Sequence, residues 1–197
     1  MGKIFYLMGK SASGKDTIYK RLLEDCPQLG RIVLYTTRPR REGETDGVEY
    51  YFTTSGTLAQ FEQENKLIEK RVYHTVAGEW SYATVDDGQI DLSANSCLTI
   101  GTLESYEKIR NYFGSEAIVP LYVFVDDGER LARALARERQ QAQPNYAELC
   151  RRFLADEQDF AGERLERLGV ERIFVNDDLE RCVEEIKISI QRNDFML

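Results

Sequence analysis

The stretch Gly9-Lys10-Ser11-Ala12-Ser13-Gly14-Lys15-Asp16-Thr17 decides the fold of this 197-residue chain. The apolar run Lys3–Met8 precedes it and predicts a buried strand. Apolar residues spaced three and four apart follow it and predict a helix over Thr17–Cys26, which Pro27 ends. A glycine-rich turn between a strand and a helix is the context in which backbone N–H groups wrap an anion. We therefore predict a phosphate-binding loop here.

The composition of the loop fits phosphate chemistry. Glycines such as Gly9 and Gly14 let the backbone turn its N–H groups inward, and the following helix adds its positive dipole end. Lys15 supplies a mobile charge for the β- and γ-phosphates. Asp16 stands where the strict pattern has a hydroxyl residue, so we assign the hydroxyl near Mg²⁺ or the α-phosphate to Thr17. The other expected phosphate-contacting residues are Ser11, Ala12, Ser13 and Asp16.

The rest of the chain alternates between short apolar runs and amphipathic segments. Strands are predicted over Arg31–Tyr35, Cys97–Ile100, Ile118–Val125 and Arg172–Val175. Helices are predicted over Ser105–Phe113, Glu129–Gln140, Tyr146–Leu168 and Leu179–Ile190, with Pro144 interrupting the helical region. This alternation predicts an α/β fold with a parallel sheet covered on both sides.

Residues from Thr36 to about Asp91 have a different texture and are predicted to form an inserted small α+β unit. Short aromatic strands are expected at Tyr50–Phe52 and Lys66–Val72, with a helix around Leu58–Asn65 between them.

Composition excludes several function classes. The net charge of −8 argues against a general nucleic-acid binder, which would be basic, although local arginines can still capture phosphate ligands. Lys3–Met8 is too short for a signal peptide or a membrane span, so we expect a cytoplasmic protein without a membrane partner. The four cysteines have no C-x-x-C spacing and are interpreted as incidental thiols, and the single His74 indicates no metal site.

A cationic turn follows the second predicted strand: Thr36-Thr-Arg38-Pro-Arg-Arg41-Glu-Gly-Glu44-Thr-Asp-Gly-Val-Glu-Tyr50. Arg38 and Arg41 can form a bidentate clamp for a phosphate dianion, completed by a tyrosine hydroxyl. Such a clamp would fix an acceptor oxygen in line with the γ-phosphate. Taken by itself, a run of this kind is better explained as a solvated charged turn.

The turn closely resembles the motif T-T-R-x-P-R-x-G-E-x-x-G-x-x-Y of the guanylate kinase family. The match runs across Thr36–Tyr50, except that Pro39 comes one place early and Arg40 takes the usual proline position. The resemblance continues at Leu67–Glu69, Tyr82–Thr84 and Val175–Asp178, and so spans nearly the whole chain.

The resemblance implies ATP-dependent phosphorylation of GMP or dGMP, with Mg²⁺ and ATP as partners of the loop and small nucleotides as the only ligands. By this resemblance the acceptor phosphate is held by Arg38, Arg41, Tyr50 and Tyr82. Glu69 and Thr84 contact guanine, and Glu44 orients the arginine turn. Arg133 and Arg137 lie in the segment that resembles the lid over the ATP phosphates, Arg152 reaches the transferred group, and Asn176 lies near the adenine.

The resemblance also implies how the chain is divided. A single domain is expected, with a phosphate-loop core over 1–34, 94–125 and 152–197. The nucleoside-monophosphate-binding insertion takes 35–93, and the helical lid takes 126–151. The oligomeric state is left open.

Three positions depart from the family pattern. Leu34 stands where the family has a serine that contacts guanine, and Thr99 and Gly101 replace two aspartates, the second of which also contacts guanine. The lid turn Glu138–Pro144 is altered as well and is a few residues longer. Since discrimination rests on hydrogen bonds whose loss leaves buried groups unpaired, these changes predict a weaker preference for guanine. Phosphoryl transfer depends on positioning and charge and is not expected to be lost.

Two alternatives remain beside ATP:GMP phosphotransfer. One is a related kinase with another acceptor, such as another nucleotide or a ribose bisphosphate, because the loop ending Gly-Lys-Asp-Thr and the missing aspartates are similar to ribose bisphosphate kinases. The nearly intact turn Thr36–Tyr50 argues against it. The other is a non-catalytic guanylate-kinase-like binding module, which the presence of Lys15 disfavours.

Overall fold

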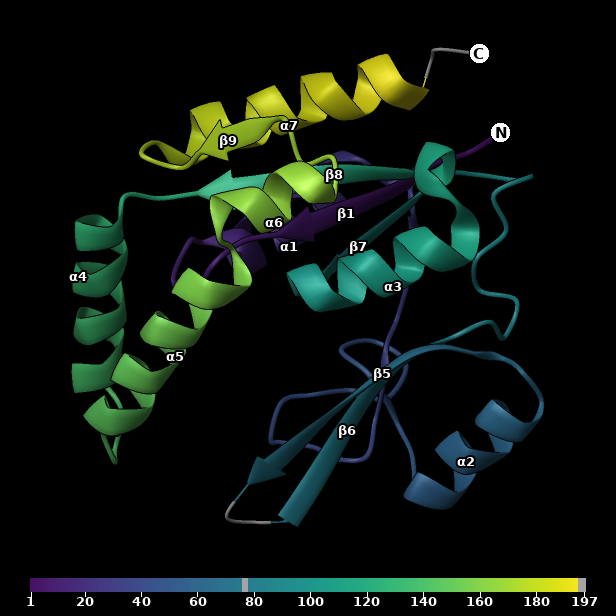
Figure 1. Cartoon of the computed structure of the whole chain (residues 1–197), viewed down its shortest axis with the longest axis horizontal. Helices are drawn as coiled ribbons and strands as arrows, with labels where there is room; N and C mark the ends of the chain where they lie inside the picture. Colours follow the sequence, from purple (N-terminus) through teal and green to yellow (C-terminus); the bar gives the residue numbers. More distant parts are fainter. Residues whose placement is uncertain (76–77, 195–197) are drawn as a thin grey trace.

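The computed structural model describes residues 1–75 and 78–194, and Figure 1 shows its arrangement. The central element is a five-stranded parallel sheet with the order β2-β7-β1-β8-β9. Its strands are β1 (Ile4–Met8), β2 (Gly30–Arg31), β7 (Cys97–Gly101), β8 (Ile118–Phe124) and β9 (Ile173–Val175). The prediction of a parallel α/β sheet is confirmed, and β1 at its centre carries the phosphate loop at its carboxyl end.

Two hydrophobic cores cover the two faces of this sheet. On one face, Phe5 and Leu7 of β1 pack with α1 (Lys15–Asp25) and α7 (Leu179–Asp194). On the other face, Ile4, Tyr6 and Met8 pack with α3 (Leu103–Phe113) and with residues around α6 (Gly162–Arg167). Since successive strand residues point to opposite faces, the continuous apolar run of β1 serves both cores. The 3₁₀ turn η1 (Ser115–Ala117) connects α3 to β8.

A second, smaller sheet has the order β4-β3-β6-β5 and lies away from the first one (Figure 1). It consists of β3 (Tyr35–Thr36), β4 (Tyr51–Phe52), β5 (Leu67–Thr75) and β6 (Gly78–Val85), and α2 (Ser55–Gln63) packs on it through the buried Leu58. The prediction of a single strand over Arg31–Tyr35 is wrong. The chain leaves the large sheet after Arg31 and enters the small one at Tyr35, so its backbone bonds are shared between two sheets.

Two helices, α4 (Asp127–Arg139) and α5 (Tyr146–Asp159), project together beyond the end of the large sheet (Figure 1). The predicted continuous helix over Tyr146–Leu168 is wrong, because the structure ends α5 at Asp159 and starts α6 at Gly162. Phe160 causes the break: its ring is buried and stacks on Tyr122 with centroids 5.4 Å apart. Anchoring that ring in the core redirects the chain.

No helix among residues 1–75 and 78–194 is long and apolar enough to cross a membrane. The cysteines are free thiols, with Cys26, Cys97 and Cys182 buried and Cys150 exposed.

Candidate functional site: a phosphate loop facing an arginine-lined lid

The loop between β1 and α1 has the backbone that its glycines predict. Gly14 has a φ of +83°, the left-handed region that favours glycine, and a Cβ there would overlap the Asn176 amide. A Cβ on Gly9 would lie 2.6 Å from the Val123 carbonyl oxygen, a separation that no side chain tolerates. Ala12 also has a positive φ, of 63°, which is a strained conformation for an L-residue. The backbone is thus held in a tight turn before any ligand is considered.

Asn176 braces this loop from behind. Its Nδ2 donates to the Ser13 carbonyl at 2.8 Å, and its own N–H donates to the Phe124 carbonyl at 2.8 Å. Arg133 Nη2 donates to the Asn176 carbonyl at 3.2 Å. Only 4% of Asn176 is exposed. The structure therefore places it as a support of the phosphate loop, and its predicted position near an adenine stays a prediction.

A cavity of about 230 Å³ opens over the loop at the N-terminus of α1. It is lined by Ala12, Gly14, Asp16, Thr17, Arg133 and Arg137. The two lid arginines of α4 thus face the loop, as the sequence predicted, and α1 directs its first backbone N–H groups to the same place. The Lys15 side chain is 20% exposed, with its Nζ 3.9 Å from a carboxylate oxygen of Asp16. This combination of N–H groups and cations suits an oligophosphate.

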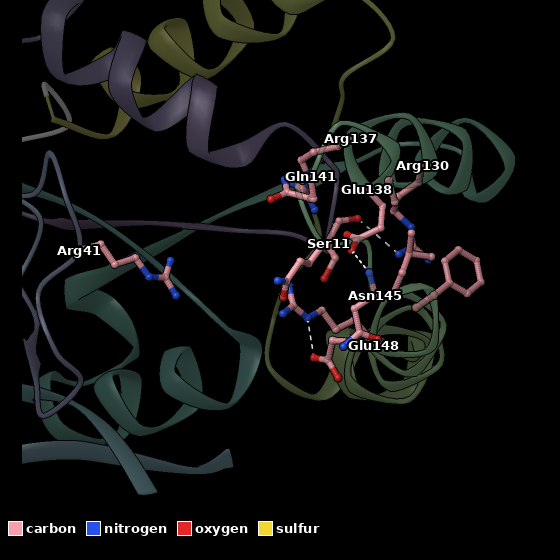
Figure 2. A pocket seen from close by; sticks show the side chains of 13 residues that line it. Ser11, Arg41, Arg130, Arg137, Glu138, Gln141, Asn145 and Glu148 are labelled. Atoms are coloured by element: carbon pink, nitrogen blue, oxygen red, sulfur yellow. Dashed lines mark hydrogen bonds and ion pairs between the residues drawn. The ribbon is translucent and has the colours of Figure 1, made fainter. Parts of the chain in front are cut away.

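A larger cavity, of about 460 Å³, lies between helices α4 and α5 on one side and Arg41 on the other. Arg41 belongs to the cationic turn Thr36–Tyr50, which is called the acceptor turn below. Most of its lining comes from α4 and α5, and Ser11 of the loop forms its floor. Figure 2 shows Arg41 on the opposite side, with its guanidinium directed toward the lid residues. Arg137 lines both cavities, so they adjoin at this side chain. The arrangement places the acceptor turn and the phosphate loop around one space.

Arg152 lines the larger cavity and is held by a carboxylate of its own helix. Its Nε donates to Glu148 at 2.8 Å, and the neighbouring Arg151 donates to the same carboxylate at 2.7 Å. Bonds from Arg151 first and Arg152 second lower the pKa of Glu148 to about 2. Arg152 is therefore oriented toward the cavity by a permanent anion.

A charged cluster that the sequence prediction missed joins the lid to the loop. Arg130 is 1% exposed and bonds to Asp127 at 2.9 Å, Asp156 at 3.2 Å and Glu157 at 2.7 Å. Lys10 of the loop bonds to the same Glu157 at 2.6 Å.

Two further contacts complete this cluster. The Ser11 N–H donates to Asp156 at 2.8 Å, and the Arg130 guanidinium lies 4.1 Å over the Phe153 ring. The start of the phosphate loop is therefore bonded directly to α5. No sequence motif indicates this pairing, because the partners lie 145 positions apart.

The acceptor turn is organised around Arg38. Only 4% of this residue is exposed, and its Nη1 donates to Glu44 at 2.7 Å while Nη2 bonds to the other oxygen of the same carboxylate. The guanidinium lies 4.9 Å from the Tyr50 ring centroid and 5.4 Å from that of Phe52. The bond from Arg38 holds the pKa of Glu44 at about 2. Glu44 also accepts the Arg41 N–H at 2.8 Å, so one carboxylate orders the whole turn, as predicted.

Arg38 retains one donor for a ligand. Its Nε is buried without a hydrogen-bond partner among the residues that the structure describes. A buried donor of this kind costs free energy unless something binds it, so a phosphate oxygen fits here. Tyr50 and Tyr82 lie beside it with ring centroids 5.6 Å apart. Arg38, Tyr50 and Tyr82 thus lie together, with Arg41 in the same turn as Arg38, and their binding of a phosphate stays a prediction.

Glu69 and Thr84, which were predicted to contact guanine, are directly paired. They face each other across β5 and β6, and the Thr84 hydroxyl donates to Glu69 at 2.9 Å. Arg71, which the sequence prediction missed, bonds to the same carboxylate through Nε at 3.1 Å. The Glu69 side chain is 0% exposed. The signal was present, because residues two apart in a strand share a face.

The structure shows what surrounds Leu34, Thr99 and Gly101, the three residues that differ from the family pattern. Thr99 is buried in β7, and Leu34 contributes its carbonyl to the Tyr51 N–H at 2.9 Å. At Gly101 a Cβ would overlap the Tyr6 hydroxyl, which donates to the Thr102 carbonyl at 3.2 Å. Burial raises the pKa of Tyr6, so the phenol stays neutral. A tyrosine from β1 therefore fills the space that a side chain at position 101 would need.

Mg²⁺ and ATP fit the donor set at the loop. Within residues 1–75 and 78–194 no cluster of three or more histidine, cysteine or acidic residues forms a metal cage. Mg²⁺ that accompanies a nucleotide needs none, since it keeps waters and binds phosphate oxygens with one or two protein ligands. The exposed Thr17 in the smaller cavity offers a hard oxygen of the required kind.

Comparison with known proteins agrees with this geometry. A family model described as guanylate kinase matches residues 1–193. The chain is similar to guanylate kinase of Syntrophus aciditrophicus, with 27% identity over 96% of this chain and 86% of the relative. It is 29% identical to that of Chlorobaculum tepidum, over 96% of this chain and 92% of the relative. The crystal structure of guanylate kinase from Anaplasma phagocytophilum superposes with a TM-score of 0.66 at 18% identity, covering 98% and 87% of the two chains.

Proposed function

The chain belongs to the guanylate kinase family, and from this premise we propose that it transfers the γ-phosphoryl group of ATP to GMP or dGMP. The observation that carries the proposal is the shared space: phosphate loop, lid arginines and Arg41 of the acceptor turn border two adjoining cavities. Phosphoryl transfer needs a donor and an acceptor held in line between positive charges. The activity belongs to purine nucleotide metabolism.

On the donor side, the loop N–H groups and the N-terminus of α1 bind the ATP phosphates, and Lys15 neutralises the β- and γ-oxygens. Mg²⁺, when bound beside Thr17, supplies further charge to the bridging phosphates. Asn176 does not touch the phosphates in this scheme. It holds the Ser13 carbonyl away from them, so that only donors face the anion.

On the acceptor side, Arg38 and Arg41 bind the nucleotide's own phosphate, with the hydroxyls of Tyr50 and Tyr82 completing the set. One oxygen of that phosphate attacks the γ-phosphorus while the bond from γ-phosphorus to the bridging oxygen breaks. No protein group needs to take a proton from a phosphate dianion, so positioning carries the reaction.

The lid arginines act on the transferred group. Arg133, Arg137 and Arg152 line the two cavities. In this scheme they are preorganised cations that stabilise the negative charge on the equatorial oxygens in the transition state. Closing α4 and α5 over the space also removes water, which would otherwise accept the phosphoryl group.

A second acceptor class has one observation in its favour. The carboxylate of Glu69 is fully enclosed by Arg71 and Thr84, which changes what the acceptor pocket presents. A kinase of this fold acting on ribose bisphosphate or another nucleotide is therefore retained as an alternative.

The test is a coupled assay of ATP turnover with GMP, dGMP, AMP, UMP, CMP and ribose bisphosphate, using the wild type, Lys15→Met and Lys20→Met. Lys20 is the control, because it is an exposed lysine on the same helix α1. We expect GMP-dependent turnover that Lys15→Met lowers by about 10²–10³-fold, the usual effect of one transition-state charge, and that Lys20→Met leaves unchanged. Turnover with none of the nucleotides, or a Lys15→Met variant within about tenfold of wild type, would contradict the proposal.

A further inference from the structure

Arg71 is a mostly buried arginine in β5 of the small sheet, and the proposed phosphoryl transfer assigns it no role. Its side chain is 9% exposed, and its guanidinium donates to Glu69 through Nε at 3.1 Å and Nη2 at 3.4 Å. The remaining Nη1 lies 3.4 Å from the Thr102 hydroxyl, at the start of α3. Arg71 therefore bridges the small sheet and the start of α3, directly after β7.

The orientation of the Glu69–Arg71 ion pair decides which of the two side chains a ligand contacts first. The Glu69 side chain is 0% exposed: its Oε1 accepts from the Thr84 hydroxyl at 2.9 Å and from Arg71 Nη2 at 3.4 Å, and its Oε2 accepts from Arg71 Nε at 3.1 Å. Arg71 keeps some exposure. A ligand that enters from the solvent side thus contacts donor groups of the guanidinium first, with the carboxylate behind them.

Arg71 also lies on the same face as the phosphate clamp. It pairs with Tyr82 across β5 and β6, so the two side chains are neighbours on one side of the sheet. Tyr82 lies 5.6 Å from Tyr50, and Tyr50 lies 4.9 Å from the Arg38 guanidinium. A ligand whose phosphate binds Arg38 therefore directs its other end along this row toward Arg71.

The chemistry of that other end follows from the donors. A guanidinium has only N–H groups, and its best match on a base is the pair O6 and N7 of guanine, whereas adenine offers an amino donor beside N7. Glu69 cancels the charge of Arg71, so the pair suits a neutral edge with lone pairs better than a second phosphate dianion.

We propose that Arg71 is a specificity-determining residue that binds O6 and N7 of a 6-oxopurine nucleotide, and that Glu69 and Thr84 are positioning residues for it. The inference rests on the proposed phosphotransfer and deepens it. It accounts for a guanine site in which residue 34 is a leucine and residue 101 is a glycine whose side-chain space is filled by the Tyr6 hydroxyl. Because hypoxanthine presents the same O6 and N7 and the 2-amino group is not bound by Arg71, IMP should serve nearly as well as GMP.

The experiment compares GMP, IMP, AMP and ribose 1,5-bisphosphate as acceptors, by kcat/KM in the coupled assay and by calorimetric binding. The variants are Arg71→Met, which keeps length and loses all donors, and Arg71→Lys, which keeps the charge that Glu69 needs but cannot bind two atoms. The control is Lys70→Met, which removes a cation from the opposite face of the same strand.

For the wild type we expect kcat/KM for GMP and IMP within about threefold, and AMP lower by about tenfold or more, the usual discrimination of one bidentate contact. Arg71→Met and Arg71→Lys should each lower kcat/KM by about tenfold, equally for GMP and for IMP, through a higher KM and weaker binding. Neither variant should change kcat/KM for AMP. Lys70→Met should change none of these ratios.

Three outcomes would overturn the inference. If GMP exceeds IMP by about 30-fold or more in the wild type, the 2-amino group is bound and Glu69 rather than Arg71 contacts the base. If folded Arg71→Lys keeps the wild-type GMP/AMP ratio, the arginine is only structural. In both cases the proposed function stands. If the wild type uses ribose 1,5-bisphosphate and no nucleotide, the proposed function fails as well. Should Arg71→Met not fold, Arg71→Lys and the GMP/IMP ratio still decide.

Discussion

At the scale of single residues, the acceptor turn shows how an arginine is kept ready for a ligand. Glu44 accepts two N–H donors of the Arg38 side chain and the backbone N–H of Arg41, so the Arg38 guanidinium and the Arg41 backbone are fixed before a phosphate arrives. A side chain that is already ordered loses less entropy when it binds. The clamp is thus preorganised by one carboxylate.

Replacing Glu44 with Gln should make the stability of the protein less dependent on pH. The pKa of Glu44 is about 2 in the folded state against an ordinary value of 4.5. A lowered pKa stabilises the fold fully above about pH 5.5, and this contribution is lost as the pH falls from 4.5 toward 2. Urea unfolding should show wild type more stable than Glu44→Gln by about 1.5 kcal/mol at pH 7, with the gap narrowing below pH 4.5.

The control for that series is Glu42→Gln, an exposed acid of the same turn. It should follow the wild type across the whole pH range. A gap between wild type and Glu44→Gln that stays constant down to pH 3 would show that the ion pair with Arg38 does not set the pKa of Glu44.

Gly101 and Tyr6 should behave as a coupled pair. Gly101→Ala places a methyl group onto the Tyr6 hydroxyl, and overpacking of this kind destabilises by about 1–3 kcal/mol. In Gly101→Ala/Tyr6→Phe the nearest remaining ring atom lies 3.0 Å from the new Cβ, so part of the loss should return. A double-mutant cycle by thermal unfolding should give a coupling of about 1 kcal/mol or more. Strictly additive losses would mean that the backbone of β7 moves aside instead.

Sequence patterns named candidate phosphate-binding residues, whose binding stays a prediction, but did not indicate the residues that hold them in place. The loop and the acceptor turn are continuous segments whose spacing carries chemical meaning. The sequence around Arg130 and Asp156 contains no such pattern, because a charged residue on a helix is ordinarily solvated. Their pairing depends on the relative positions of two helices. Arg71 lies between these cases, because strand periodicity places it beside Glu69 but does not show that the two are buried together.

At the scale of elements, α4 and α5 contain the predicted lid segment 126–151, and they are joined to the core mainly by charged groups. Arg130 of α4 is buried among Asp127, Asp156 and Glu157, and α5 bonds to Lys10 and Ser11 of the phosphate loop. Few apolar contacts are made by α5, which has no fully buried residue. The cluster therefore sets where the lid stands relative to the loop.

Arg130→Met should destabilise the protein and lower kcat together. Removing one member of a buried ion pair costs about 3–5 kcal/mol, and a smaller loss of about 2–3 kcal/mol is expected because Asp127 and Glu157 are partly exposed. Thermal unfolding and steady-state kinetics on the same samples measure both. Arg139→Met, at an exposed position on the same helix, should change neither. A stable Arg130→Met variant with normal kcat would exclude the cluster as the anchor of the lid.

Most element types followed the sequence, although β6 (Gly78–Val85) was not predicted, and two of the errors share a cause. The predicted strand Arg31–Tyr35 and the predicted helix Tyr146–Leu168 are each continuous in local pattern. Each is divided by a tertiary contact: the first because two sheets compete for it, the second because Phe160 is inserted beside Tyr122. Local periodicity contains neither contact.

At the scale of the whole molecule, the chain forms three parts: the large sheet, the small sheet and the helix pair α4 and α5 (Figure 1). Alternating strands and helices predicted the first, and the change of texture after Thr36 predicted the second. The spaces between them could not be predicted, since they depend on contacts such as Arg71 with Thr102 and Lys10 with Glu157. Such contacts fix how the three parts are placed relative to one another, and no local sequence pattern contains them.

The bond from Asn176 to Ser13 has a consequence for biosynthesis. The side chain that braces residues 9–17 lies 163 positions later in the chain. The partner strand β8, which supplies the carbonyl next to Gly9, also follows the loop by more than a hundred residues. The loop of a nascent chain therefore leaves the ribosome well before the residues that fix its backbone. We expect the loop to reach its folded conformation only when the segment around Asn176 has emerged.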